Sequence, residues 1–490
     1  MNWKEKYAQL IETYHPHILV IDTEGVLLRS ELRSFLMQKG YVFIACSSAK
    51  ELAILCKEIS QEKDKRFLIE SRAILSLPNH LYKDIGLKKV NYNDLFLNLS
   101  IDFLKTALDE DLDILSLPIA KVFERQTVEQ TQTLLHSVQK ELVKAQLEKD
   151  KRHLLKLETQ ITNLKDIDYK NPRTWLDLIP LLSEIVLLRR KLNVGMPLKD
   201  WQAIEDNLNN AFQTFIHSTY KTLHNRTFIK QPFLVTRLLD FIDSVKSPKS
   251  ALIVIDGMSY LQWQLIAEGL NQNIIAFTER ATYAWLPSIT AWSRQAIFRG
   301  SEPDIYNKKT ESALFKAYWQ EKGRIDIAFQ KISFLKKETW DTPTSSILGI
   351  VINDLDELMH TEKLGMEHLL SNTAFWLNKT QSILSFIKLL KEQGYTLFIT
   401  SDHGNIEAHG IGNIDLSNRN LSVSRSKRHI LFSDTILKEK FLKNKTTQLL
   451  SEEELSVFLT QRDAFAPQDE QVITHGGSHF WEIVVPFIQI

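Results

Sequence analysis

The sequence has little with which to cross-link itself or to enter a membrane. Its two cysteines, Cys46 and Cys56, lie near one end of the 490 residues, so a disulfide between them could not cross-link the rest of the chain. They also do not resemble a metal-binding pair. We therefore expect a reducing cytoplasm. The longest apolar runs, such as ALIVI and IVVPFI, are far shorter than the ~20 residues of a membrane-spanning helix. The first residues are charged and lack the apolar core of a signal peptide, so we expect neither a membrane segment nor a leader.

An excess of charge of either sign is also missing. Lysine and arginine total 60, and aspartate and glutamate also total 60. This balance gives no support for a long basic groove that binds nucleic acid. The hydrophobic content of 43% is ordinary for a globular protein, whereas 490 residues exceed what a single core usually holds. Two or three domains are expected.

Helix-breaking residues are absent from a long part of the chain. No glycine occurs between Gly86 and Gly195, and no proline between Pro118 and Pro172. Apolar residues recur there at spacings of three and four, which predicts one long amphipathic helix or an antiparallel pair. The stretches TWLDLIPLLSEIVLLRRKLN and WQAIEDNLNNAFQTFIHSTYKTL continue the helical pattern. We assign residues 126–247 to a helical linker or partner-docking region.

Residues 1–125 alternate short apolar runs with helical stretches. The strand candidates are HILVID, YVFIACSS, RFLIES and DILSLP, and SELRSFLMQKG predicts a helix that ends at Gly40. This βαβ pattern predicts a small α/β domain. Asp22 follows the first strand candidate, but the partner residues of a receiver domain and the second aspartate of a haloacid dehalogenase loop are missing.

Residues 248–490 return to an α/β pattern. Six continuous apolar runs of strand length are separated in several places by helical patterns: ALIVI, NIIAFT, ILGIVI, TLFIT, HILF and EIVVPFIQI. The pattern predicts a doubly wound, mostly parallel sheet covered by helices on both faces. In such a sheet, functional side chains gather beyond the carboxyl ends of the strands.

Three of these runs are followed by carboxylates. Asp256 follows ALIVI, Asp356 follows ILGIVI by a few residues, and Asp402 follows TLFIT. One such aspartate is most often part of a turn, but three together indicate a site. His360 lies four residues after Asp356, which places both side chains on one face of a helix. His403 directly follows Asp402, so one tight loop presents two metal-ligand types.

Three further candidates come from other segments. His475 precedes two glycines and a buried strand, from where it can reach a cleft; a loop histidine bonded to backbone is the alternative. Thr290 begins the helical stretch TAWSRQAIF, where the helix dipole favours negative charge and a metal would lower the hydroxyl pKa. A helix cap without chemistry is the alternative for Thr290. Arg294, one turn later, either contacts phosphate or packs against this helix.

Five blocks of sequence then carry a family resemblance. In this order, VIDGMSY, LPSITAWSRQAIFRG, NDLDELMH, TSDHGN and THGGSHFWEIVVPFI resemble the PglZ domain of the alkaline phosphatase superfamily over about the last 240 residues. The resemblance implies a doubly wound α/β sandwich that holds two Zn²⁺ ions, with Mn²⁺ as another option. It implies two ligand sets, the first bridged by Thr290 as the nucleophile: Asp256, Asp402 and His403; and Asp356, His360 and His475.

The charges of these residues agree with two divalent ions. Three aspartates and a Thr290 alkoxide would balance four positive charges, and zinc suits mixed nitrogen and oxygen ligands. The implied reaction is attack of Thr290 on phosphorus, which gives a phosphothreonine that is then hydrolysed.

PglZ domains occur in bacterial BREX-type phage-defence loci, beside a methyltransferase and a large ATPase, and in two-component regulators that hydrolyse oligonucleotide phosphodiesters. Because residues 1–125 fit a receiver poorly, the resemblance favours a defence phosphatase or phosphodiesterase that acts on a phosphate ester, a nucleotide or an oligonucleotide. The alternatives are an oligonucleotide or cyclic-oligonucleotide phosphodiesterase in signalling, and a metal-stabilised scaffold whose catalysis is dispensable. A mutase would need a cap domain, and residues 300–347 are short and charged for one. The natural substrate, the oligomeric state and the role of the N-terminal domain stay open.

Overall fold

A computed structural model describes residues 2–59, 62, 65–73, 75, 85–162, 168–193, 198–225, 231–304, 309–336, 344–379, 382–414, 421–443, 450–453 and 455–490. The chain forms two compact units, Met1–Lys151 and Arg152–Ile490. None of the helices in this described part combines the length and the apolar character that crossing a bilayer requires.

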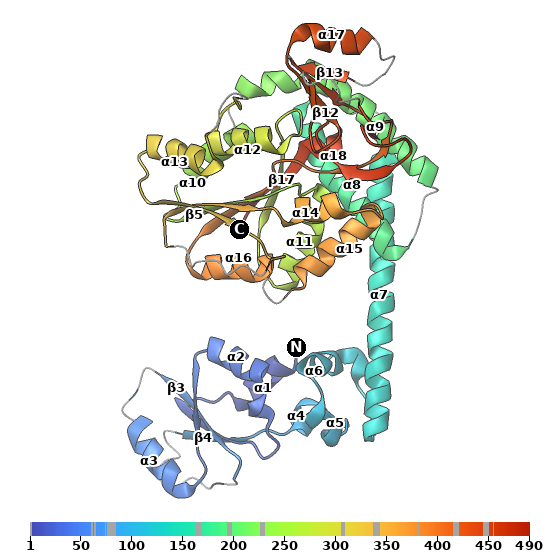
Figure 1. Cartoon of the computed structure of the whole chain (residues 1–490). Helices are drawn as coiled ribbons and strands as arrows, with labels where there is room; N and C mark the ends of the chain where they lie inside the picture. The colour runs from blue at the N-terminus through green and yellow to red at the C-terminus, as the bar shows by residue number, and fades with distance from the viewer. Residues whose placement is uncertain are drawn as a thin grey trace. The chain divides into compact units, whose positions relative to one another are not determined.

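The first unit contains a parallel sheet of four strands in the order β2-β3-β1-β4 (Figure 1). The strands are β1 (His17–Ile21), β2 (Tyr41–Ala45), β3 (Arg66–Ser71) and β4 (Ile85–Lys89). Because successive strand residues face opposite sides, Ile18 and Val20 join a core with α1 (Trp3–Ile11) and α2 (Ser30–Gln38), whereas Leu19 and Ile21 join one with α3 (Ala49–Ile59). The predicted α/β character of this region is confirmed.

One strand prediction in this unit was wrong. The run DILSLP lies in α6 (Asp109–Leu115) and the short helical turn after it, not in a strand. Leu112 and Leu115 are buried three residues apart, which is the spacing of a helix face. The remaining short helices of the unit are α4 (Tyr92–Leu95) and α5 (Ile101–Thr106).

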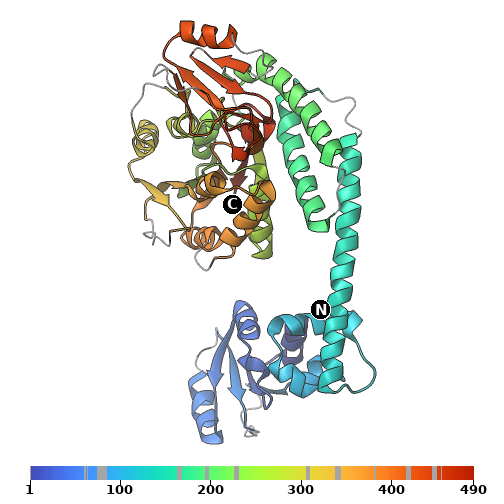
Figure 2. The ribbon, with the colours of Figure 1, turned by 45° about the vertical axis from the view of Figure 1, so that its right-hand side comes forward.

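Within the glycine-free stretch, α7 (Val128–Thr162) is one uninterrupted helix of 35 residues. Near its end, Leu154 and Leu157 pack against Ile185 of α8 (Pro172–Leu192). Figure 2 shows this end of α7 beside α8 and α9 (Leu198–Ser218). Both later helices follow the predicted helical stretches, and residues of both join the main core of the second unit.

The second unit is built on a six-stranded sheet in the order β6-β17-β9-β5-β8-β7. The bounds are β5 (Ser250–Ile255), β6 (Thr278–Tyr283), β7 (Ile327–Ile332), β8 (Ile347–Ile352), β9 (Thr396–Thr400) and β17 (Val484–Gln489). Strand β5 pairs in parallel with β8 and β9, and β7 with β8, whereas β17 runs antiparallel to both neighbours. The predicted mostly parallel sheet is confirmed.

Helices cover both faces of this sheet. The first core joins Ile253, Ile350 and Ile399 to α8, α9, α11 (Tyr260–Gln272), α15 (Met366–Leu377) and α16 (Ile383–Glu392). The second joins Val254 and Val351 to α10 (Leu238–Val245), α12 (Thr290–Arg299) and α13 (Glu311–Glu321). The alternation along each strand therefore produces the doubly wound arrangement, with buried apolar runs on both faces.

Two predicted strands of this unit differ from the structure. The run NIIAFT contributes only its last residue to β6, and Ile274 before it has a positive φ of 57° and is 94% exposed. The run HILF is β12 (His429–Phe432), but it belongs to a separate antiparallel sheet with β11 (Leu421–Val423), β13 (Leu450–Glu453) and β14 (Ser456–Leu459). A third small sheet contains β10 (Ile406–Gly410), β15 (Asp463–Ala464) and β16 (Gln471–Thr474).

A fully buried ion pair ties the β12 sheet to the segment that precedes β17. Arg428 Nε and Nη2 each donate to Glu482 of α18 (Phe480–Ile483) over 3.1 Å, and both side chains are 0% exposed. Glu482 also accepts the backbone N–H groups of Gly477 and His479. A carboxylate buried to this degree is tolerated because it is paired and fully hydrogen-bonded.

We expect Arg428→Met to lower the free energy of unfolding of the second unit by about 3–5 kcal/mol, because it leaves Glu482 buried without its partner. Urea titration monitored by tryptophan fluorescence measures the change. The matched control, Arg190→Met, removes a pair with Glu367 that is 29% and 74% exposed, and should cost about 1 kcal/mol or less. Equal losses in the two variants would contradict this account.

Candidate metal centre

Strand ends of the main sheet bring the predicted residues together. Asp256 directly follows β5, Asp356 and His360 lie on α14 (Asp354–Thr361) just after β8, and Asp402 follows β9 by one residue. Because β5, β8 and β9 are parallel neighbours, their carboxyl ends meet at one edge. His403 lies next to Asp402 in the loop after β9, and the remaining predicted residues reach this edge from α12 and from the loop after β16: Thr290, Arg294 and His475.

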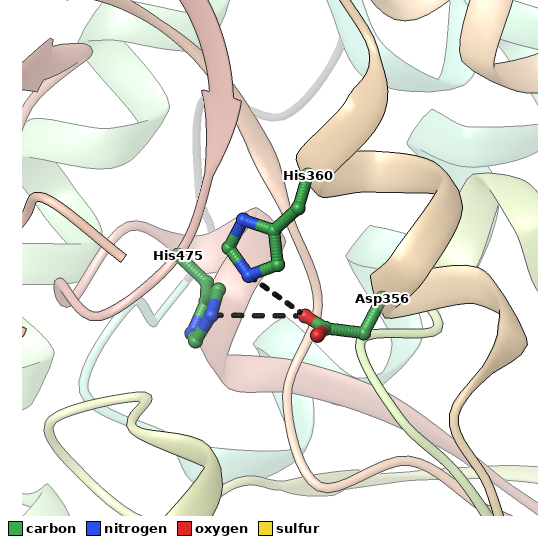
Figure 3. A group of neighbouring side chains, drawn as sticks. All are labelled: Asp356, His360 and His475. Atoms are coloured by element: carbon green, nitrogen blue, oxygen red, sulfur yellow. Dashed lines mark ion pairs between the residues drawn. The ribbon is translucent and has the colours of Figure 1, made fainter. Parts of the chain in front are cut away.

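One group of possible metal ligands comes from α14 and the loop after β16. Asp356 Oδ1 lies 3.3 Å from His360 Nε2 and 3.9 Å from His475 Nε2 (Figure 3). Figure 3 shows both imidazole rings turned toward this carboxylate. Ligand atoms of the three residues lie within 4.8 Å of one another. Ligands about 2.0–2.2 Å from a common ion would lie at similar separations, so this group fits a metal ion.

The orientation of two histidines supports the same interpretation. Nδ1 of His475 lies 2.7 Å from the carbonyl oxygen of Ser288, and Nδ1 of His403 lies 2.9 Å from that of Gly404. A carbonyl oxygen only accepts, so each Nδ1 carries the proton and each Nε2 keeps a lone pair. The rings stack with centroids 3.8 Å apart. Both therefore present Nε2 as a ligand, held from behind in the manner typical of metal-bound histidine.

The second group surrounds Thr290. The ligand atoms of Asp256, Asp356 and His403 lie within 4.8 Å of one another, and His403 Nε2 is 3.6 Å from Asp256 Oδ1. Asp402 Oδ2 lies 3.8 Å from the same His403 nitrogen. Thr290 is the first residue of α12, and its Oγ1 is 2.9 Å from His403 Nε2. A candidate nucleophile therefore lies beside the second group of ligands.

Arg294 is committed to protein partners in this structure. Its guanidinium pairs with Asp256, donates from Nε to Asp402 over 3.0 Å, and donates to Asn353 over 2.7 Å and to Glu311 over 3.2 Å. The side chain is 6% exposed, although it lines the pocket. The geometry thus shows an arginine that pairs with two of the predicted carboxylate ligands, Asp256 and Asp402, and its contact with phosphate stays a prediction.

The electrostatics show a cluster short of positive charge. Burial raises the pKa of the Asp256 carboxyl well above its ordinary value, and the nearby charge of Asp402 adds to this. Burial also lowers the pKa of His475 to about 3, so this ring is neutral near pH 7 and able to bind a metal. For Asp356, burial is outweighed by the nearby rings of His360 and His403, which lower the pKa of this carboxyl to about 2.

Two buried carboxylate oxygens test whether the site fits an ion. Neither Asp256 Oδ1 nor Asp356 Oδ1 accepts a hydrogen bond within the described part of the chain. Orphaned buried carboxylate oxygens are costly unless a cation completes them. These are the same two atoms that face His403 and His360, so the unsatisfied positions coincide with the candidate ligand groups. The residues fit divalent metal ions that accept mixed nitrogen and oxygen ligands.

A pocket of about 360 Å³ opens onto these groups. Asp256, Thr290, Asp356, His360 and His475 line it, whereas Asp402 and His403 lie behind and are 0% exposed. The rim includes Ser424, Arg425 and Ser426 from the turn between β11 and β12. The small antiparallel sheet therefore contributes an exposed cation to the mouth of the pocket.

Sequence reasoning missed the residues that hold the ligands. Ser288 positions His475 through its carbonyl and accepts the N–H of Gly476 on Oγ, over 2.8 Å. Glu482 fixes the following backbone, as described above. Gly404 donates its N–H to the carbonyl of Glu482 over 2.8 Å, and a Cβ there would overlap the carbonyl of Trp481. The sequence signal that could have indicated these roles is that Ser288 and Glu482 lie inside the two motifs that contain Thr290 and His475.

Comparison with known proteins gives a family match and several distant structural neighbours. The matching family is described as the BREX system PglZ alkaline phosphatase-like domain, over residues 233–490. No curated protein matches the chain in sequence.

Similar solved structures include phosphonoacetate hydrolase from Sinorhizobium meliloti 1021 in complex with phosphonoformate. The two sequences are 14% identical, the match covers 49% of this chain and 89% of that chain, and the TM-score is 0.34. They also include murine ectonucleotide pyrophosphatase / phosphodiesterase 5, with 12% identity, 49% and 87% coverage, and a TM-score of 0.36. The family match spans more than half of the chain and contains every residue of the candidate metal centre. The chain belongs to the PglZ family of alkaline phosphatase-like domains.

Proposed function

We propose that this protein is a zinc-dependent phosphatase or phosphodiesterase whose nucleophile is Thr290. The observation that carries the proposal is the position of the Thr290 hydroxyl. It lies in the pocket, at the start of α12 and 2.9 Å from Nε2 of His403, a member of the second group of metal-ligand side chains. The helix N-terminus favours negative charge on this oxygen and on a bound phosphoryl group.

The reaction follows from this placement. Asp256, Asp402 and His403 would hold one ion beside Thr290, and Asp356, His360 and His475 would hold the other. Two zinc ions, when bound, supply the positive charge that lowers the hydroxyl pKa and offsets the charge of the phosphoryl oxygens. The Thr290 oxygen forms a bond to phosphorus while the bond to the ester oxygen breaks, and the hydroxyl proton ends on the departing alcohol. Water then cleaves the phosphothreonine, which returns the hydroxyl and releases phosphate or a phosphomonoester.

Arg294 has a supporting part in this scheme. It pairs with Asp256 and Asp402 and is itself balanced by Glu311, so it would hold both carboxylates in place for a bound ion. We assign it a positioning role.

We infer that the biological setting is antiphage defence, because the matched family is described as part of the BREX system. The helical region around α8 and α9 would dock partner proteins such as a methyltransferase or an ATPase. A plaque assay of the complete defence locus with Thr290→Ala separates catalysis from scaffolding. Loss of protection is expected, and full protection would favour the scaffold.

An oligonucleotide or cyclic-oligonucleotide substrate is favoured by one further feature. Arg425 is exposed, lines the pocket and makes no ion pair within the described part of the chain. A cation at this position suits the second phosphate of a nucleotide diester, beyond the reacting phosphorus.

Thr290→Ala should lower the turnover of nitrophenyl phosphate mono- and diesters by about three orders of magnitude, because the nucleophile is removed. Metal content, measured by plasma mass spectrometry, should change little, since the aspartate and histidine ligands remain. Thr361→Ala, an exposed threonine on α14, is the control and should keep full activity. Undiminished turnover in the Thr290 variant would exclude this threonine as the nucleophile.

His475→Ala should reduce bound zinc by about one ion per chain and weaken the rise in melting temperature on adding zinc, because one ligand group loses a member. Chelator should abolish turnover of the unaltered protein. His368→Ala changes a half-exposed histidine on α15 paired with Glu362, and should leave zinc content unchanged. A protein that binds no zinc, or a His475 variant with undiminished zinc, would contradict the assignment.

Arg425→Ala should raise the KM for a dinucleotide several-fold while leaving the kcat and the KM for a nitrophenyl monoester nearly unchanged. The same substitution at Lys440, an exposed residue on α17 (Thr435–Lys443), serves as the control. Parallel changes for both substrates would show that Arg425 does not read the second phosphate.

A further inference from the structure

A second pocket lies in the first unit, beyond the carboxyl ends of its parallel strands. It has a volume of about 340 Å³. Its lining comes from three strand ends and a helix, since Glu24 and Gly25 follow β1, Arg72 follows β3, Tyr92 follows β4 and Lys105 lies on α5. This edge of an open parallel sheet is where α/β domains bind ligands. The pocket belongs to a unit that contributes no residue to the metal centre.

The charge of this pocket is positive. Three cationic side chains, Arg29, Arg72 and Lys105, line it with a single carboxylate, Glu24. Arg29 is held in place by Asp109, over 2.7 Å, and by the hydroxyl of Tyr92, also over 2.7 Å. Glu24 accepts the backbone N–H of Tyr92 over 2.7 Å, so part of its charge is already compensated.

Two of the cations are not engaged by the protein. Arg72 and Lys105 are exposed, come from separate elements, and make no ion pair in the described part of the chain. Gly25 has a positive φ of 77°, and a Cβ at this position would lie 3.7 Å from Nη2 of Arg72. The left-handed turn at Gly25 therefore leaves the guanidinium lying directly over the backbone of the loop after β1.

An apolar side chain stands beside these cations. Leu28 lines the same pocket and is 51% exposed, whereas Val26 and Leu27 just before it are fully buried. The pocket thus offers cations for an anionic group and an uncovered apolar surface for a neighbouring part of the same molecule. This combination suits a small organic phosphate better than a bare inorganic ion.

A covalent role for the nearby aspartate is not supported. Asp22 is 0% exposed, and its two carboxylate oxygens accept the N–H groups of Val26 and Leu27 over 2.9 and 2.8 Å. Its function in the structure is to hold the loop that forms one wall of the pocket. Binding, rather than transfer of a phosphoryl group to Asp22, is the activity that this geometry allows.

We propose that the first unit binds a small organic phosphate in this pocket, through Arg72 and Lys105, with Leu28 against its apolar part. The guanidinium of Arg72 donates paired hydrogen bonds to the phosphate, and the ammonium of Lys105 adds a second charge. The pocket is separate from the proposed phosphoesterase site, so the protein would have a ligand-sensing site as well as a reacting one.

Binding of ADP to the full-length protein tests the proposal. The Thr290→Ala background with its metals in place prevents turnover of the probe. Isothermal titration and hydrogen exchange are then compared for this background, for the added pair Arg72→Ala and Lys105→Ala, and for a control pair, Lys50→Ala and Arg125→Ala. The control removes the same two charges from exposed positions outside the pocket.

We expect ADP to protect the amides of residues 23–29 from exchange in the background and control proteins, and the pocket variant to lose this protection. The affinity of the ADP site in the first unit should fall about tenfold or more. With Thr290 restored, the pocket variant should keep its melting temperature and its hydrolysis of nitrophenyl esters, which shows that it is folded. Absence of protection at residues 23–29, equal protection in the pocket variant, or equal loss in the control pair would overturn the proposal.

Discussion

The structure depends on one constraint: several carboxylates are buried at one edge of the sheet, and the protein's own cations do not balance all of their charge. Asp256, Asp356 and Asp402 converge because three parallel strands end together, and the same convergence removes them from water. Arg294 offsets part of this charge, and two oxygens remain without a hydrogen bond among the described residues. Much of the surrounding architecture acts to hold ligands in place where solvent cannot do so.

That support is built largely from backbone groups. The carbonyl of Ser288 orients His475, the carbonyl of Gly404 orients His403, and the amide of Gly257 donates to Asp402. Glu482 binds the backbone on either side of Ser478 and is neutralised by Arg428 from another sheet. The candidate metal centre therefore depends on the docking of the small β12 sheet as well as on the strands that precede the candidate ligands.

Sequence patterns predicted the elements whose burial is local and uniform. Strands β5, β8 and β9 are continuous apolar runs, and the residues after them form the centre. The strand prediction for NIIAFT was wrong because an apolar residue, Ile274, is exposed in a turn. The strand prediction for DILSLP was wrong because the apolar pattern of a helix face resembles that of a strand over six residues. The roles of Ser288 and Glu482 depend on contacts across more than 50 residues, and the sheet membership of HILF depends on pairing with β11 and β14. No local periodicity records such contacts.

The placement of Arg425 has a consequence for how the pocket could vary among PglZ-family domains. Its turn, residues 424–428, begins at the rim of the pocket and ends at Arg428, the anchor of the buried pair. Ser426, between them, fills the space that a side chain at position 476 would need. Substitutions at Ser424 and Arg425 would change the lining of the pocket. Substitutions at Ser426 or Arg428 would instead disturb the loop that carries His475. Within this turn, Ser424 and Arg425 therefore line the pocket without supporting the loop that carries His475.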